Sequence, residues 1–78
     1  MKNVLVTGGC GFIGSNFVKL LTENKELFPV VLDKLTYAGS LSNLDDIDKS
    51  VFIFFEGDIC DKTLIDSLFK EYNFIAVF

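Results

Sequence analysis

Four glycines stand within seven residues near the start of the chain, in the stretch TGGCGFIGS of residues 7–15. Glycine has no Cβ, so the backbone can turn tightly and approach an anion there. The first N–H groups of a helix that follows such a turn have no intrahelical acceptor. The spacing fits G-x-G-x-x-G from Gly9, or T-G-x-x-G-x-x-G from Gly8, and both versions continue through Gly11 and Gly14. The pattern is typical of a turn that binds the pyrophosphate of a dinucleotide.

An acidic residue follows at the distance that such a site needs. Asp33 ends the apolar run of residues 28–32, nineteen residues after Gly14. At the end of a second strand its carboxylate can accept hydrogen bonds from the adenosine ribose and would repel the 2′-phosphate of NADP. We therefore expect NAD as the cofactor, although the ammonium of Lys34 could partly offset that repulsion. Without a nucleotide, Asp33 would be an ordinary polar residue at a strand end.

A third candidate group follows the apolar run of residues 51–55. Asp58 and Ile59 lie just after this run, at the end of a third strand. In an open parallel sheet, ligands bind in the crevice beside the carboxyl ends of the strands. Asp58 is then either a hydrogen-bond acceptor at that crevice or the N-cap of the next helix, a position that Asp61 could fill equally well.

These candidates need a framework of alternating strands and helices. The apolar patterns predict strands over residues 3–7, 28–33, 51–55 and 74–78, helices over 12–25 and from 62 onward, and a short helical turn near 41–45. We expect an α/β fold: the first half of a Rossmann-type doubly wound parallel sheet, with strand order 3-2-1-4. The near-continuous apolar run of residues 51–55 predicts a strand buried on both faces. The expected core faces of the two helices are Ile13, Phe17, Leu20 and Leu21, and Leu64, Ile65, Leu68, Phe69 and Tyr72.

Composition excludes several other classes of function. The chain has 78 residues, half of them apolar, a net charge of −4 and neither arginine nor histidine. An acidic chain without arginine lacks the basic patch that nucleic acids require. No run approaches the length of a signal peptide's apolar region or a membrane span, so we expect no membrane partner and a cytoplasmic location.

The sequence predicts no metal site. Cys10 and Cys60 are too few for a disulfide framework and are not spaced like the ligands of a zinc site. We therefore interpret both as small residues with reduced thiols. The acids Asp45, Asp46 and Asp48 are more typical of a solvated face than of a cation site.

The segments TGGCGFIGSNF, LDKLTYAGSLSNL and EGDICD occur in this order. With them the chain resembles the nucleotide-sugar branch of the extended short-chain dehydrogenases and, within it, the dTDP-glucose 4,6-dehydratases. The resemblance runs from Met1 to Phe78, and its most specific part is the block of residues 33–39. Cys10 stands where alanine is commonest in the family, which is a tolerable change in size.

The resemblance implies a role for each matching position. The pyrophosphate would lie on the glycine turn and the backbone after it, the adenosine ribose at Asp33, and the exocyclic amine of adenine at Asp58. The implied cofactor-binding residues are Gly8, Gly11, Phe12, Ile13, Gly14, Asp33, Lys34, Leu35, Thr36, Gly39, Asp58 and Ile59. The resemblance also implies NAD as cofactor, dTDP-glucose as substrate, a lyase reaction that removes water from the sugar, and a homodimer for the full-length enzyme.

The catalytic residues of that family have no counterpart in this chain. The family's base is the tyrosine of a Tyr-x-x-x-Lys pattern, but Tyr37 is followed four positions later by Leu41, and Tyr72 by Ala76. The Asp-Glu pair that serves the elimination is also missing. We therefore assign no catalytic residue and expect the chain alone to be inactive.

The apolar stretch of residues 74–78 would form an uncovered edge strand, which natural domains avoid. We therefore expect residues 1–78 to be a partial NAD-binding domain of a larger protein, without its substrate domain. Two alternatives stay open: a non-catalytic nucleotide-binding or interaction module, and a related epimerase or dehydratase that acts on a UDP- or CDP-sugar.

Overall fold

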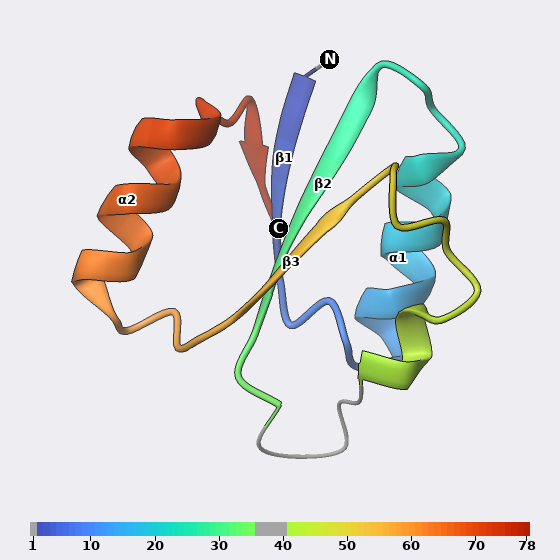
Figure 1. Ribbon diagram of the computed structural model, residues 1–78, viewed down its shortest axis with the longest axis horizontal. Helices are drawn as coiled ribbons and strands as arrows, with labels where there is room; N and C mark the ends of the chain where they lie inside the picture. The colour runs from blue at the N-terminus through green and yellow to red at the C-terminus, as the bar shows by residue number, and fades with distance from the viewer. Residues whose placement is uncertain (1, 36–40) are drawn as a thin grey trace.

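The computed structural model of the chain describes residues 2–35 and 41–78. Four parallel strands form a sheet in the order β3-β2-β1-β4, which confirms the predicted 3-2-1-4 arrangement. Figure 1 shows α2 on one side of this sheet and α1 with the short helix η1 on the other. The elements are β1 (Lys2–Thr7), α1 (Phe12–Thr22), β2 (Leu27–Asp33), the 3-10 helix η1 (Leu41–Leu44), β3 (Ile53–Glu56), α2 (Lys62–Tyr72) and β4 (Ala76–Val77).

The strand register brings the predicted polar positions to one edge of the sheet. Thr7 is paired with Leu32 across β1 and β2, and Asp33 with Glu56 across β2 and β3. Because all four strands run in the same direction, the turns that follow β1, β2 and β3 leave the sheet at this edge. It is the lower edge of the sheet in Figure 1.

Alternation along the central strands builds a core on each face of the sheet. Val4, Val6 and Val31 lie in the cluster on the α1 side. Leu5 and Val30 lie in the cluster on the α2 side, together with Leu32 and Leu68. Each fully buried aliphatic side chain contributes about 1.5–3 kcal/mol to folding, so both helices are held against the sheet by the period-2 pattern of β1 and β2.

Helix α1 differs from its prediction in length and in its buried face. It ends at Thr22 rather than near Lys25, and the side chains of Ile13 and Leu20 are 83% and 62% exposed. The fully buried residues are Ser15 and Val18, while the predicted Phe17 and Leu21 are half-buried and pack against the core on the α1 side. The reason is steric: Gly14 lies directly against the carbonyl of Gly8, so the face that carries Gly14 and Val18 turns inward, and Ile13 and Leu20 lie outside it.

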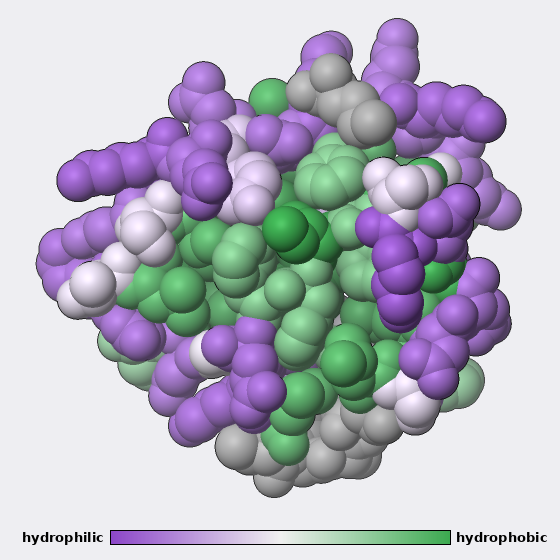
Figure 2. All heavy atoms as spheres, viewed as in Figure 1, coloured by the Kyte–Doolittle hydropathy of each residue, from purple (hydrophilic) through white to green (hydrophobic). Residues whose placement is uncertain are grey.

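The outer strands are shorter than predicted. β3 begins at Ile53, and its residues are half-buried apart from the exposed Glu56, rather than enclosed on both faces. It lies at one edge of the sheet that the described residues form. β4 covers only Ala76–Val77, although Phe78 continues the ladder by donating its N–H to Leu5 and accepting one from Thr7. Apolar side chains gather in the middle of the face seen in Figure 2, with hydrophilic ones around them. No helix within residues 2–35 and 41–78 has the length and apolar character needed to cross a bilayer.

Candidate cofactor site

The glycine turn begins with a residue that must be glycine for conformational reasons. Gly8 has φ 68°, in the left-handed region that side chains with a Cβ rarely adopt. Its N–H donates to the carbonyl of Leu32 over 2.8 Å, and its own carbonyl accepts the N–H of Gly11 over 3.2 Å. The turn is therefore fixed to the end of β2 as well as to the end of β1.

Two other positions require glycine because neighbouring atoms lie too close for a Cβ. A Cβ built on Gly14 would stand 2.2 Å from the carbonyl oxygen of Gly8, and one built on Gly9 would stand 2.5 Å from Cγ1 of Val31. At Gly11 the nearest atom would be 3.5 Å away, an ordinary van der Waals distance. The fold itself thus requires glycine at positions 8, 9 and 14 but not at 11. Gly9 was missing from the predicted site set, although the G-x-G spacing contained the signal.

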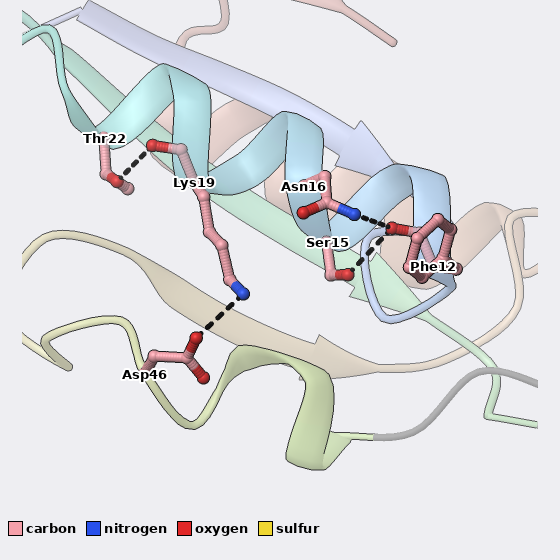
Figure 3. Close-up of polar contacts among 6 residues, drawn as sticks. All are labelled: Phe12, Ser15, Asn16, Lys19, Thr22 and Asp46. Atoms are coloured by element: carbon pink, nitrogen blue, oxygen red, sulfur yellow. Dashed lines mark hydrogen bonds and ion pairs between the residues drawn. The ribbon is translucent and has the colours of Figure 1, made fainter.

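Within the described residues, the amino end of α1 lacks a side-chain cap for its backbone N–H groups. Gly11 is the N-cap residue. The side chains of Ser15 and Asn16 both donate to the carbonyl of Phe12, over 3.0 and 2.8 Å, as Figure 3 shows. The N–H groups of the first turn have no intrahelical acceptor, and the helix dipole makes this end partly positive. The turn can therefore hold an anion.

Asp33 is buried and holds the turn in place. Its side chain is 3% exposed, and its Oδ2 accepts the backbone N–H of Cys10 over 2.8 Å. Its Oδ1 accepts the N–H of Leu35 over 2.9 Å, where the backbone takes a left-handed φ of 59°. Each carboxylate oxygen has two lone pairs, so both can accept a further hydrogen bond. Sequence reasoning gave Asp33 a ligand role and missed this structural one.

A second link to the turn comes from η1. The side-chain amide of Asn43 donates to the carbonyl of Cys10 over 2.7 Å. Lys19 of α1 forms an ion pair at 2.9 Å with Asp46, just after η1, as Figure 3 shows. Asn43 carries no pattern in the sequence that could have predicted its contact.

Asp58 is paired with the lysine next to Asp33. The ammonium of Lys34 lies 2.9 Å from Oδ2 of Asp58, and Oδ1 accepts the backbone N–H of Cys60 over 2.8 Å. The N–H of Cys60 and then the bond from Lys34 lower the pKa of Asp58, while the hydrogen bond to Asp58 raises the pKa of Lys34. The N-cap of α2 is Asp61, which accepts the N–H of Leu64 over 3.2 Å. Asp58 is therefore not the cap and stays available at the crevice.

These groups surround a cleft of about 360 Å³ at the carboxyl edge of the sheet. Of the predicted residues, Gly8, Asp33, Lys34, Asp58 and Ile59 line it. The other lining residues are Thr7, Leu32 and Gly57.

The remaining predicted residues fall into three groups. Gly11, Phe12, Ile13 and Gly14 lie in the turn and the first turn of α1 rather than in the lining of the cleft. Leu35 packs against the core cluster on the α1 side instead of facing the cleft. The predicted contacts of Thr36 and Gly39 fall on residues that lie outside the described part of the chain.

The described residues offer no metal centre: no three of their acidic or cysteine side chains come together as ligands. Cys10 is fully buried, and burial followed by the nearby charge of Asp33 raises the pKa of its thiol from 9.0 to about 11. Such a thiol is protonated at neutral pH and is a poor nucleophile.

A parallel sheet in the order 3-2-1-4, with a glycine turn after the first strand and an acid at the end of the second, defines the first half of a Rossmann-type doubly wound domain. Comparison with known proteins makes the assignment more specific. The chain belongs to the GDP-mannose 4,6 dehydratase family, whose sequence profile matches residues 5–78.

Individual relatives agree with this assignment. The chain is 49% identical over 77 residues to a dTDP-glucose 4,6-dehydratase of Neisseria gonorrhoeae, covering 97% of this chain and 22% of the relative. The dTDP-glucose 4,6-dehydratase of Bacillus anthracis, solved in complex with NAD, superimposes with a TM-score of 0.90 at 37% identity, over 99% of this chain and 26% of that one. The UDP-glucose 4-epimerase of Thermus thermophilus, solved with NAD, gives a TM-score of 0.77 at 40% identity, over 96% and 22%.

The resemblance to dTDP-glucose 4,6-dehydratases is thus confirmed. The chain spans about a quarter of the length of these relatives.

Proposed function

We propose that the chain binds NAD and forms the cofactor-binding part, residues 1–78, of a dTDP-glucose 4,6-dehydratase. The observation that carries the proposal is the cleft in which Asp33 stands between the glycine turn and Asp58. The relatives solved with NAD support the same cofactor here.

The pyrophosphate would lie at the N–H groups of Phe12 and Ile13, at the positive end of α1. Packing within the fold does not require glycine at position 11. Its missing Cβ would instead leave room for the pyrophosphate to approach the backbone. An anion at this position is stabilised by unpaired N–H donors and by the helix dipole.

The adenosine half would occupy the cleft. Asp33 would accept hydrogen bonds from the ribose hydroxyls. It would use the lone pairs that the backbone N–H groups of Cys10 and Leu35 leave free. Asp58 would accept the exocyclic amine of adenine, and the 58% exposed side chain of Ile59 offers an apolar surface to the ring. Lys34 lies at the proposed ribose end, while the contacts of Thr36 and Gly39 stay predictions outside the described residues.

NAD held at this site would supply a reversible hydride acceptor for the sugar. The residues of this chain would hold the dinucleotide tightly enough to keep it through the reaction, while the base and the sugar site would come from the segment that follows in the relatives. We propose dTDP-glucose as the substrate and a homodimer as the assembly of the complete enzyme.

A second candidate is an epimerase that acts on a UDP-sugar. The 40% identity to the Thermus thermophilus epimerase favours it, and the same cofactor cleft would serve both reactions. The block of residues 33–39 favours the dehydratase, because related epimerases do not usually share it.

The experiment is to express the complete reading frame, measure its intact mass, titrate it with NAD by calorimetry and then incubate it with dTDP-glucose and with UDP-glucose. A dehydratase gives a product lighter by one water, whereas an epimerase gives a product of unchanged mass. We expect NAD binding and loss of water from dTDP-glucose. Absence of NAD binding would overturn the cofactor site, and NAD binding with no loss of water would overturn only the dehydratase assignment.

A further inference from the structure

The ion pair between Lys34 and Asp58 joins the two loops that border the ribose end of the cleft. Lys34 directly follows Asp33, and Asp58 lies two residues after Glu56, which is paired with Asp33 in the sheet. The backbone adds a further contact here, since the N–H of Gly57 donates to the carbonyl of Asp33 over 3.1 Å. The pair is therefore built on the strand ends that form the floor of the cleft.

A cation beside the acid at the end of β2 can affect the choice between NAD and NADP. In dinucleotide sites a basic side chain near this position accommodates the 2′-phosphate of NADP. Lys34 supplies such a cation, but Asp58 holds its ammonium at 2.9 Å. Asp58 is itself fixed, because its other oxygen accepts the N–H of Cys60. The charge that could attract a 2′-phosphate is thus neutralised by a carboxylate from the neighbouring loop.

We propose that Asp58 is a specificity-determining residue that favours NAD over NADP by holding the ammonium of Lys34 away from the ribose; this inference rests on the proposed NAD site. Asp33 repels a 2′-phosphate directly. Asp58 removes the cation that would compensate for that repulsion. The free lone pairs of Asp58 still leave an acceptor for the adenine amine.

The expected size of the effect follows from exposure. The side chains of Lys34 and Asp58 are 55% and 37% exposed, so water and salt screen the pair. We expect a change of about twofold to fivefold in the selectivity ratio, larger at low salt than at high salt.

The test compares the dissociation constants of NAD and NADP in the complete protein. The readout is the ratio Kd(NADP)/Kd(NAD), measured by calorimetric competition at low and high salt. Both nucleotides carry the same adenine, so any loss of the adenine contact cancels in this ratio. We expect Asp58→Asn to lower the ratio, because the ammonium is released, and the double variant Lys34→Met with Asp58→Asn to restore it.

Asp66→Asn is the matched control. Lys62 and Asp66 form an ion pair with the same 2.9 Å separation on α2, and neither residue lines the cleft. This variant should leave the ratio unchanged. The inference is wrong if Asp58→Asn binds NAD with an unchanged ratio, or if the double variant keeps the lowered ratio. Failure of the unmodified protein to bind NAD would instead overturn the proposed function, and this inference with it.

Discussion

The buried carboxylate of Asp33 accepts the backbone N–H of Cys10 over 2.8 Å, which ties the end of β2 to the glycine turn after β1. The same carboxylate keeps Leu35 in a left-handed backbone conformation through its second oxygen. The residue proposed to bind the ribose therefore also shapes the turn proposed to bind the pyrophosphate. Substitutions at this position are expected to affect folding and binding together.

Asp33→Asn should lower the free energy of unfolding by about 1–3 kcal/mol. The amide has the size of the carboxylate but only one acceptor oxygen, so one of the two N–H donors would face an NH₂ group. Urea denaturation followed by circular dichroism measures the loss. Asp46→Asn, at a side chain that is 73% exposed, should change stability by less than about 0.5 kcal/mol. Equal stability of the two variants would show that the hydrogen bonds of Asp33 contribute nothing to the fold.

Gly14→Ala and Gly11→Ala should separate folding from binding. The first places a Cβ 2.2 Å from the carbonyl oxygen of Gly8, and backbone must move to make room, so we expect a loss of about 3 kcal/mol of stability. The second meets no close atom and should cost about 1 kcal/mol or less, the usual penalty of alanine at an N-cap. Chemical denaturation gives both values.

At Gly11 we expect a large effect on NAD binding although the effect on stability is small. Gly11→Ala should fold and yet weaken NAD binding by about tenfold or more, because its methyl group would stand where the pyrophosphate approaches. Calorimetric titration of the folded variant measures this change. Wild-type affinity in Gly11→Ala would place the pyrophosphate elsewhere.

Much of this arrangement could be predicted from the sequence because its signals are local. The order of apolar runs predicts the parallel sheet, and the spacing from Gly14 to Asp33 predicts which two strand ends meet. The contact of Asn43 with Cys10 could not be predicted, since it joins residues 33 positions apart through an ordinary amide. The choice of Asp61 over Asp58 as helix cap could not be predicted either, because both aspartates stand within a few residues of the helix start and the choice depends on the residue at which α2 begins.

The errors in α1 and β3 have a common physical cause. Periodicity shows which residues are apolar but not how closely a neighbouring element approaches. Ile13 and Leu20 fit a helical stripe, yet the close contact at Gly14 turns a different face toward the sheet. The apolar run of residues 51–55 predicted a strand buried on both faces, whereas the residues of β3 are half-buried or exposed.

The two cysteines should differ sharply in reactivity. Cys10 is fully buried with a pKa of about 11, whereas Cys60 is exposed. At pH 8 an alkylating reagent should modify Cys60 rapidly and reach Cys10 only after the protein unfolds, because the thiolate is the reactive form. Intact-mass spectrometry with and without urea counts the modified thiols. Rapid modification of Cys10 in the folded chain would mean that the glycine turn opens readily.

Cys10 should also make the fold sensitive to alkali. Burial raises the pKa of its thiol from 9.0 to about 11, so the folded state binds this proton more tightly than the unfolded state does. The resulting stabilisation is fully present below pH 9 and is lost as the pH rises toward about 11. We expect the free energy of unfolding to fall more steeply across this window in the wild type than in Cys10→Ala.

The pKa values of Tyr72 and Lys34 are raised as well, and both groups titrate equally in the two proteins, so only the difference in slope reports on Cys10. Parallel slopes in urea denaturation series from pH 8 to 11 would show that the thiol stays protonated no more readily in the folded chain than in the unfolded one.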